Sequence, residues 1–300
     1  MTAAGVAPSS RSMAPSPGRD FGLTRRDLIG INGASGLLSS SAHAASFRLK
    51  QMTDSPFVVF LAALVAQWGA AYAGDLLRNR IRPVPKQERE DLDTVLTATL
   101  TLFALIIGFS FSMAVTRYDL RKNYEEAEAN AIGTEYLRAG LLPAEDAAKV
   151  RALLGTYVDQ RILFYLGKER QIGETGPKPE QVQADLWSTV AHAGSAQPTP
   201  VVALAVAGMN DVLNSQGYTQ AAWENRIPFA AWAMMGLIAV FSNLLLGYRE
   251  RSSGKLAPVV LPVIASIAFL LIADIDSPHG GVIRVAPHNL VLTAQSMKAP

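Results

Sequence analysis

Two aspartates near the C-terminus, in the stretch IADIDSPHGG, are the residues that most directly suggest chemistry. Phosphotransferases with an aspartyl intermediate end a strand in Asp-x-Asp, where the acids supply the nucleophile and a magnesium ligand. Asp274 and Asp276 have this spacing. The apolar run before them is 18 residues long and no βα units surround it, which favours a helix end at the membrane surface. There the acids would cap backbone groups or pair with Arg226 or Arg284, and Pro278 would turn the chain.

A second cluster of ionisable residues follows residue 116. It comprises Glu125, Glu126, Glu128 and Glu135, with Arg121, Lys122 and Arg138 close by in the sequence. Arg121 and Glu125 stand four residues apart, a spacing at which side chains pair on a helix surface. We therefore expect a solvated, salt-bridged helix face. A cation site made of these carboxylates is the alternative.

No pattern in the sequence supports a catalytic assignment. The chain contains no Ser-His-Asp order, phosphate-binding loop or helical His-Glu-x-x-His motif. It has no cysteine, which excludes disulfides, thiol catalysis and cysteine-ligated metals. His279 and His288 match no strong metal-binding spacing. We predict that the protein is not an enzyme and needs neither a metal nor a cofactor.

Composition instead indicates a membrane protein. Of the 300 residues, 49% are hydrophobic and 17% are charged, which is too apolar for an ordinary soluble domain. A net charge of +2 gives no reason to expect a nucleic-acid partner. A bilayer crossing takes about 20 apolar residues. Four stretches are long enough: Phe57–Gly74, Thr94–Val115, Ile227–Tyr248 and Leu256–Ala273.

The N-terminal segment, residues 1–51, is set apart from the fold. Its first part is rich in Ala, Pro, Ser and Gly and is typical of disorder. Arg25 and Arg26 then precede a weakly apolar middle and an Ala-His-Ala site, as in a twin-arginine export signal. The alternative is an over-called start, with Met52 as the first residue.

The remaining chain shows no strand pattern, so we predict an all-α protein. It divides into four parts. Transmembrane hairpin 1 occupies residues 52–116, a helical extramembrane domain 117–226, transmembrane hairpin 2 residues 227–274, and a polar tail 275–300. Both hairpin links are basic, which by the positive-inside rule places them in the cytoplasm. Arg117, Arg121 and Lys122 on the opposite side reduce this asymmetry and leave the orientation open.

The second span has no break before the polar region. We expect one helix from Thr94 through Arg117 to about Ala139, where Gly140 and Pro143 end it. Further helices are predicted over residues 144–166, 180–193 and 201–225. A helix that passes from lipid into water without a break couples the second span mechanically to the extramembrane domain.

Five motifs in this order resemble the bacterial bestrophin-like family, which is distantly similar to bestrophin anion channels. They are GFSFSMAVTRYDLR, EANAIGTEYLRAGLLP, LWSTV, NRIP and IADIDSPHGGVIRV. Within them Glu128, Asn130, Gly133, Arg138, Pro143, Arg226, Pro228, Asp274, Asp276 and Pro278 are motif residues of unknown role. The resemblance implies a bacterial inner-membrane protein that assembles as a homo-oligomer, a pentamer if it follows bestrophins.

The resemblance to bestrophins also implies a pore. There the second span carries Gly-Phe followed by Thr-Arg and an aromatic residue, and its apolar side chains form a narrow neck. Carried over, the neck comprises Phe109, Leu105 and Thr101 or Leu102, and Arg117 lies at the pore mouth. Apolar rings of this kind block ions by dewetting. Leu at 105 and Thr at 101 depart from the aromatic pattern, and the acidic run that holds calcium in animal members is missing.

The leading hypothesis is therefore a channel for small anions, gated near Phe109. A non-conducting membrane scaffold that binds a partner through its helical domain is the alternative. The phosphotransferase around Asp274 is a third. Leu105 and Phe109 would have a purely structural role if they pack against lipid or neighbouring spans. Arg117 would have one if it contacts lipid headgroups.

Overall fold

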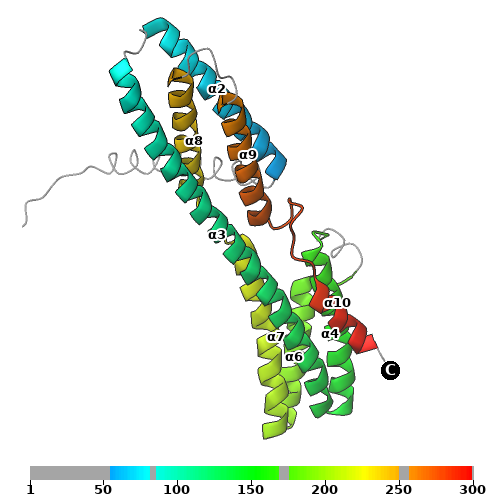
Figure 1. Ribbon diagram of the computed structural model, residues 1–300. Coiled ribbons are helices and arrows are strands. Elements are labelled where there is room, and N and C mark those ends of the chain that lie inside the picture. Colours follow the sequence, from blue (N-terminus) through cyan, green and yellow to red (C-terminus); the bar gives the residue numbers. More distant parts are fainter. Residues whose placement is uncertain (1–54, 82–85, 169–175, 250–256, 299–300) are drawn as a thin grey trace, which may run out of the picture. The chain divides into compact units, whose positions relative to one another are not determined.

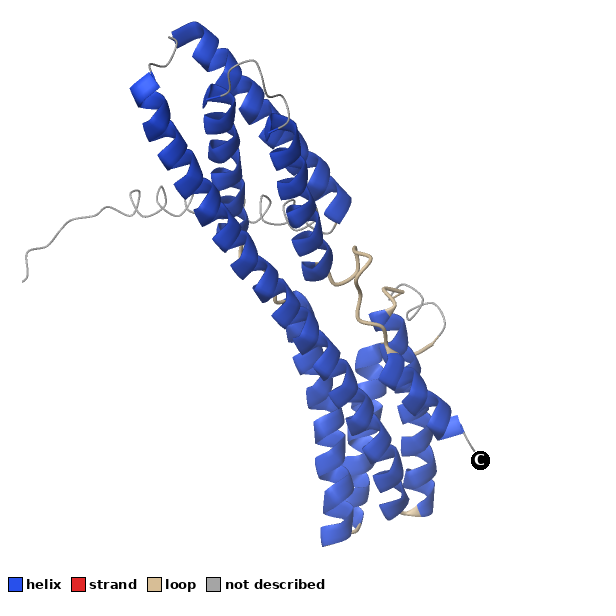
Figure 2. Cartoon of the chain, in the orientation of Figure 1, coloured by secondary structure: helices blue, strands red, loops and turns tan. Residues whose placement is uncertain are grey.

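The computed structural model describes residues 55–81, 86–168, 176–249 and 257–298. These residues form helices joined by turns, with no strand among them, as Figure 2 shows. The helices are α2 (Pro56–Ile81), α3 (Lys86–Arg138), α4 (Ala144–Tyr165), α6 (Pro179–Ala196), α7 (Pro200–Glu224), α8 (Phe229–Arg249), α9 (Ala257–Asp276) and α10 (His288–Lys298). The all-α prediction is confirmed. The export-signal hypothesis and parts of both hairpin links lie outside the described residues.

Four helical segments are long and apolar enough to cross a membrane: Pro56–Arg80, Glu90–Leu141, Pro200–Arg249 and Pro258–Asp276. The first three each contain a predicted span, and the fourth covers the predicted span Leu256–Ala273 from Pro258 onward. The third includes both α7 and α8, yet the helix is interrupted at residues 225–228. Pro228 explains this interruption, because a proline disfavours helical geometry in the residue before it.

The two helical hairpins of the membrane part pack against each other. Helix α2 packs mainly on α8 and α9, and α3 also packs on α8 and α9, as Figure 1 shows for the part of the chain above the α7 label. The crossing of α2 and α8 is close: a Cβ at Gly74 would overlap the carbonyl of Leu244, and one at Gly247 would overlap that of Ala71. Small residues permit such backbone contact between membrane helices.

A buried polar cluster joins three of these helices. Gln67 of α2 donates to the hydroxyl of Ser266 on α9 at 3.1 Å, and Asn243 of α8 donates to Gln67 Oε1 at 3.1 Å. Each side chain is at most 4% exposed. In an apolar environment these groups favour one another over any other partner, so the cluster fixes how α2, α8 and α9 pack.

Helix α3 runs unbroken for 53 residues and a short 3₁₀ turn, Ala139–Leu141, ends it. At 1.5 Å per residue it is about 80 Å long. Its C-terminal part packs against α7, α10 and α4, and α6 completes this helical domain by packing on α4 and α7. The predicted passage of a single helix from the apolar stretch into the polar region is confirmed (Figure 1).

Residues 275–300, expected as a polar tail, contain helix α10. Leu290 and Ala294 of α10 are buried in the core of the helical domain, together with Ile132 of α3, Leu154 of α4 and Met209 of α7. The tail is therefore an integral element of that domain. Its amphipathic pattern covers only 11 residues, which is too short to be distinctive in a polar segment.

Candidate functional site

The neck candidates lie on a surface of α3 that is open in the single chain. Leu105 is 54% exposed and Phe109 is 63% exposed, and Thr101 is exposed as well. They follow one another at four-residue intervals, so they share one face of the helix. This face is available to lipid or to another subunit.

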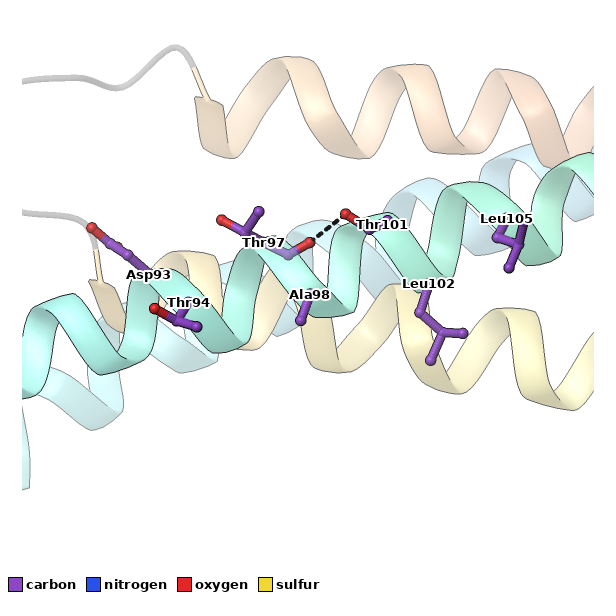
Figure 3. Close-up of a pocket in the computed structure, with 7 residues that line it drawn as sticks. All are labelled: Asp93, Thr94, Thr97, Ala98, Thr101, Leu102 and Leu105. Carbon is purple, nitrogen blue, oxygen red and sulfur yellow. Dashed lines mark hydrogen bonds between the residues drawn. The ribbon is translucent and has the colours of Figure 1, made fainter.

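An open groove follows the same face toward the start of α3. It is lined by Asp93, Thr94, Thr97, Ala98, Thr101, Leu102 and Leu105, all of them on α3 (Figure 3). The Thr101 hydroxyl donates to the Thr97 carbonyl at 2.8 Å, and the Thr94 hydroxyl donates to the Glu90 carbonyl at 3.0 Å. Threonine satisfies its donor in this way on an apolar surface. The face thus changes from hydroxyl-bearing to fully apolar at Leu105.

Arg117 lies beyond the neck face, where the membrane bundle meets the helical domain. Its Nη1 donates to the side-chain oxygen of Asn225 at 2.6 Å. Asn225 follows the last residue of α7. The pore-mouth candidate is therefore bound to the break between α7 and α8.

Arg121, one turn further along α3, is buried with 2% exposure. Its guanidinium donates to the backbone carbonyls of Ala222 at 3.4 Å, Ile275 at 3.2 Å and Asp276 at 2.9 Å. The final carbonyls of a helix have no partner within that helix. A single side chain of α3 thus caps the C-terminal ends of both α7 and α9.

Asp276 completes this polar joint, which we define as Arg117, Arg121, Asn225, Arg226 and Asp276. Asp276 Oδ1 accepts the backbone N–H of Ile227 at 3.1 Å, and Oδ2 lies 4.0 Å from Arg226 Nε. Pro228 follows Ile227 and directly precedes α8. Three of the sequence motifs, TRYDLR, NRIP and IADIDSP, therefore meet at one place although they are distant in the sequence.

Asp274 has a different role. Its Oδ1 accepts the N–H of Val282 at 2.7 Å, and its Oδ2 accepts the N–H of Ile283 at 2.8 Å. Gly281 lies so close that a Cβ there would meet the Asp274 side chain at 2.6 Å. Pro278 stands within the loop that this carboxylate holds. Both oxygens are engaged in shaping the backbone, an arrangement that does not favour a nucleophile.

The acidic group on α3 differs from the predicted solvated face. Glu125, Glu128 and Glu135 are at most 1% exposed, and only Glu126 of the four glutamates faces solvent. Arg121 and the three buried acids share one stripe of the helix with Ile132. The prediction was wrong because it considered pairing along α3 and not pairing with distant helices.

Glu125 attaches the C-terminal helix. Its Oε1 accepts the N–H of Leu290 at 3.0 Å and its Oε2 accepts the side-chain amide of Asn289 at 2.7 Å. Both residues belong to the first turn of α10, where backbone N–H groups lack helical partners and a negative charge is favourable. The carboxylate thus caps α10 from another helix.

Glu128 is the centre of a buried network. It accepts two hydrogen bonds from the Arg161 guanidinium, one from Tyr165 at 3.3 Å and one from Thr219 at 3.0 Å. Burial, and then the Glu128 charge, raise the pKa of the Tyr165 phenol well above its usual range. Burial followed by the same carboxylate likewise raises the pKa of the Tyr157 phenol above its usual range. This network ties α3 to α4 and α7.

The remaining motif residues are dispersed. Asn130 is exposed on α3, and a Cβ added at Gly133 would lie 3.4 Å from the side chain of Thr293 on α10. Pro143 precedes α4 as its N-cap residue, and Arg138 lies against Gly208 of α7. Sequence reasoning missed Arg161, Tyr165 and Thr219, whose polar character appears within apolar helical stripes. One sequence signal could have indicated that Glu128 is buried: the apolar residues Ala129 and Ile132 lie next to it and one turn further along α3.

Comparisons with known proteins agree on one family. Residues 59–290 match the bestrophin-like domain. A search of the curated proteins gave no match.

Solved structures with a similar fold include a point mutant of a bacterial bestrophin homolog from Klebsiella pneumoniae. It is 14% identical, with a TM-score of 0.54 and coverage of 79% of this chain and 96% of that chain. A second point mutant of this homolog is 13% identical, with a TM-score of 0.57 and coverage of 80% of this chain and 99% of that chain. At this identity the likeness concerns the fold alone. The domain match extends over most of the chain, and the protein therefore belongs to the bestrophin-like family.

Proposed function

We propose that the protein is an oligomeric channel for small anions in the bacterial inner membrane, with several copies of α3 around a common axis. The observation that carries this proposal is the uncovered apolar face of α3 at Leu105 and Phe109. A face of this kind on a membrane helix can line a pore once subunits assemble. Membership of the bestrophin-like family supports it. The resemblance to bestrophins implies a pentamer.

In this mechanism Leu105 and Phe109 form the neck. Apolar rings at a pore axis expel water when the pore is narrow and admit ions when it widens. Arg117 stands on the same helix toward the helical domain, where a positive charge would raise the local concentration of anions. Its hydrogen bond to Asn225 fixes it to the α7–α8 break.

The polar joint would transmit movement to the neck. Arg121 connects the ends of α7 and α9 to α3, and α3 continues without interruption to Phe109. A rotation of the helical domain would therefore turn the neck face with it. Lipid is the immediate partner of the outer surfaces of α2, α8 and α9.

Anion flux through liposomes that contain the purified protein tests this function. The variants are Phe109→Ala and Leu105→Ala, and the matched control is Phe57→Ala, since Phe57 is 66% exposed on α2. Either neck variant should raise flux or remove its gating, while the control behaves like the wild type.

Two results would overturn parts of the proposal. A cation flux without anion flux would retain the channel and reject its ion class. Absence of flux from every variant over a range of ions and pH would reject the channel. Measurement of the particle mass in detergent tests the pentamer separately.

A further inference from the structure

Glu135 differs from the other buried charges of α3. It is 0% exposed, and neither of its carboxylate oxygens has a hydrogen-bond partner in the part of the chain that the structure describes. By contrast, the Glu125 and Glu128 carboxylates each receive several hydrogen bonds. Glu135 also lies within a motif of the family resemblance, and none of the roles assigned above includes it.

The carboxyl group is enclosed where α3 and α7 cross. A Cβ at Gly208 of α7 would overlap Glu135 Oε2 and Arg138 Nη1, so α7 approaches to this distance only because residue 208 is glycine. Glu135 is 20 residues beyond Val115, the end of the apolar stretch, or about 30 Å along the helix. It therefore belongs to the helical domain and not to the lipid-embedded part.

The charged groups around the site are few. Arg138 on α3 favours the ionised carboxylate, and Asp211, one turn beyond Gly208 on α7, disfavours it. Arg151 of α4 is directed to Tyr136, where it donates to the backbone carbonyl at 3.4 Å and lies 5.4 Å from the ring centroid. The nearest cation, Arg138, makes no hydrogen bond to Glu135 in this arrangement.

A buried carboxylate without a donor is strongly unfavourable, whereas the neutral acid is tolerated. We propose that Glu135 is a proton-binding site that controls how α7 packs on α3. With its proton bound, the acid fits between the helices at Gly208. When the proton leaves to solvent, the carboxylate requires Arg138 or water as a partner, and α7 separates from α3 at this point.

The direction of the pH effect follows from proton counting. A solvated glutamate ionises above about pH 4. The opened domain thus releases this proton at a pH where the packed domain still holds it, so the opened state binds fewer protons. Packing of α7 on α3 is then strongest at low pH and weakens as the pH rises. This proposal does not require that the protein conducts ions.

Two measurements on the full-length protein in detergent test the site. Infrared spectra at neutral pH should contain the carbonyl band of a buried carboxylic acid, and that band should be missing from Glu135→Gln. Hydrogen-exchange protection factors of residues 200–212 should fall by up to roughly tenfold per pH unit in the wild type. They should stay constant in Glu135→Gln. Glu126→Gln is the control, because Glu126 is exposed on the same helix.

A further variant keeps the test decisive if Glu135→Gln does not fold. Asp211 is exposed, and Asp211→Asn removes a negative charge that opposes ionisation. The fall in protection should therefore level off at a lower pH in Asp211→Asn than in the wild type. An unchanged profile in this variant, the same pH slope in Glu135→Gln as in the wild type, or an infrared band that persists in Glu135→Gln would each overturn the proposal.

Discussion

Arg121 of α3 bonds to the backbone carbonyl of Asp276, with its Nη2 2.9 Å from the oxygen, and not to the carboxylate of that residue. The Asp276 carboxylate is thereby left to accept the N–H of Ile227 ahead of α8. One residue at the end of α9 thus contacts α3 through its carbonyl and the segment ahead of α8 through its carboxylate. The joint between the membrane helices and the helical domain therefore depends on identified hydrogen bonds, each of which a substitution can remove.

Replacement of Arg121 should weaken the joint. Arg121→Met keeps the length of the side chain and leaves three carbonyls without their donor. We expect a loss of about 2–4 kcal/mol in the free energy of unfolding. Thermal denaturation in detergent measures it, with Lys122→Met as the exposed control. An equal effect of the two substitutions would show that Arg121 does not hold the joint.

The crossing of α2 and α8 should not tolerate a methyl group. Gly247→Ala places a Cβ against the carbonyl of Ala71, and we expect a cost of about 1–3 kcal/mol from overpacking. Gly236→Ala on the same helix has no atom within 4 Å of the added Cβ and should be neutral. The difference in melting temperature between these variants is the measurement, and no difference would contradict the close crossing.

Two substitutions in the network around Glu128 should lower the stability of the protein to different extents. Tyr165→Phe removes the hydroxyl that lies 3.3 Å from Glu128 Oε2 and 3.5 Å from Thr219 Oγ1, and it should cost about 1 kcal/mol. Glu128→Leu leaves the buried Arg161 unpaired and should cost about 3–5 kcal/mol. Denaturation of both variants and of the exposed control Glu126→Leu tests this order. A Glu128→Leu protein as stable as its control would refute the role of the network.

Asp274→Asn should loosen the loop that follows α9. An amide has only one oxygen to accept the two N–H groups of Val282 and Ile283. Faster hydrogen exchange is therefore expected over residues 277–287, while exposed Asp119→Asn leaves it unchanged. If Asp274→Asn instead abolished a phosphatase activity of the purified wild type without altering exchange, that result would support Asp274 as a nucleophile and contradict its role in shaping the loop.

The helices could be predicted from sequence because their signals are local. Apolar length identifies the four spans, and Pro200 and Pro228 place the interruptions before α7 and α8. The absence of a breaker after Phe109 predicts the long helix α3. Sequence reasoning also assigned the family, since its motifs are contiguous. Helix α10 was missed, because 11 weakly amphipathic residues resemble a polar tail.

The partners of the charged residues were decided only by the tertiary structure. Glu125 meets Leu290 across 165 positions of sequence, and Glu128 meets Arg161 across 33. Helical periodicity places the glutamates on one face of α3, but it cannot tell whether that face meets water or other helices. Burial of an ionised group becomes favourable only when a distant donor is brought to it. The sequence therefore determined the helices of this protein, and packing determined which of its charges face inward.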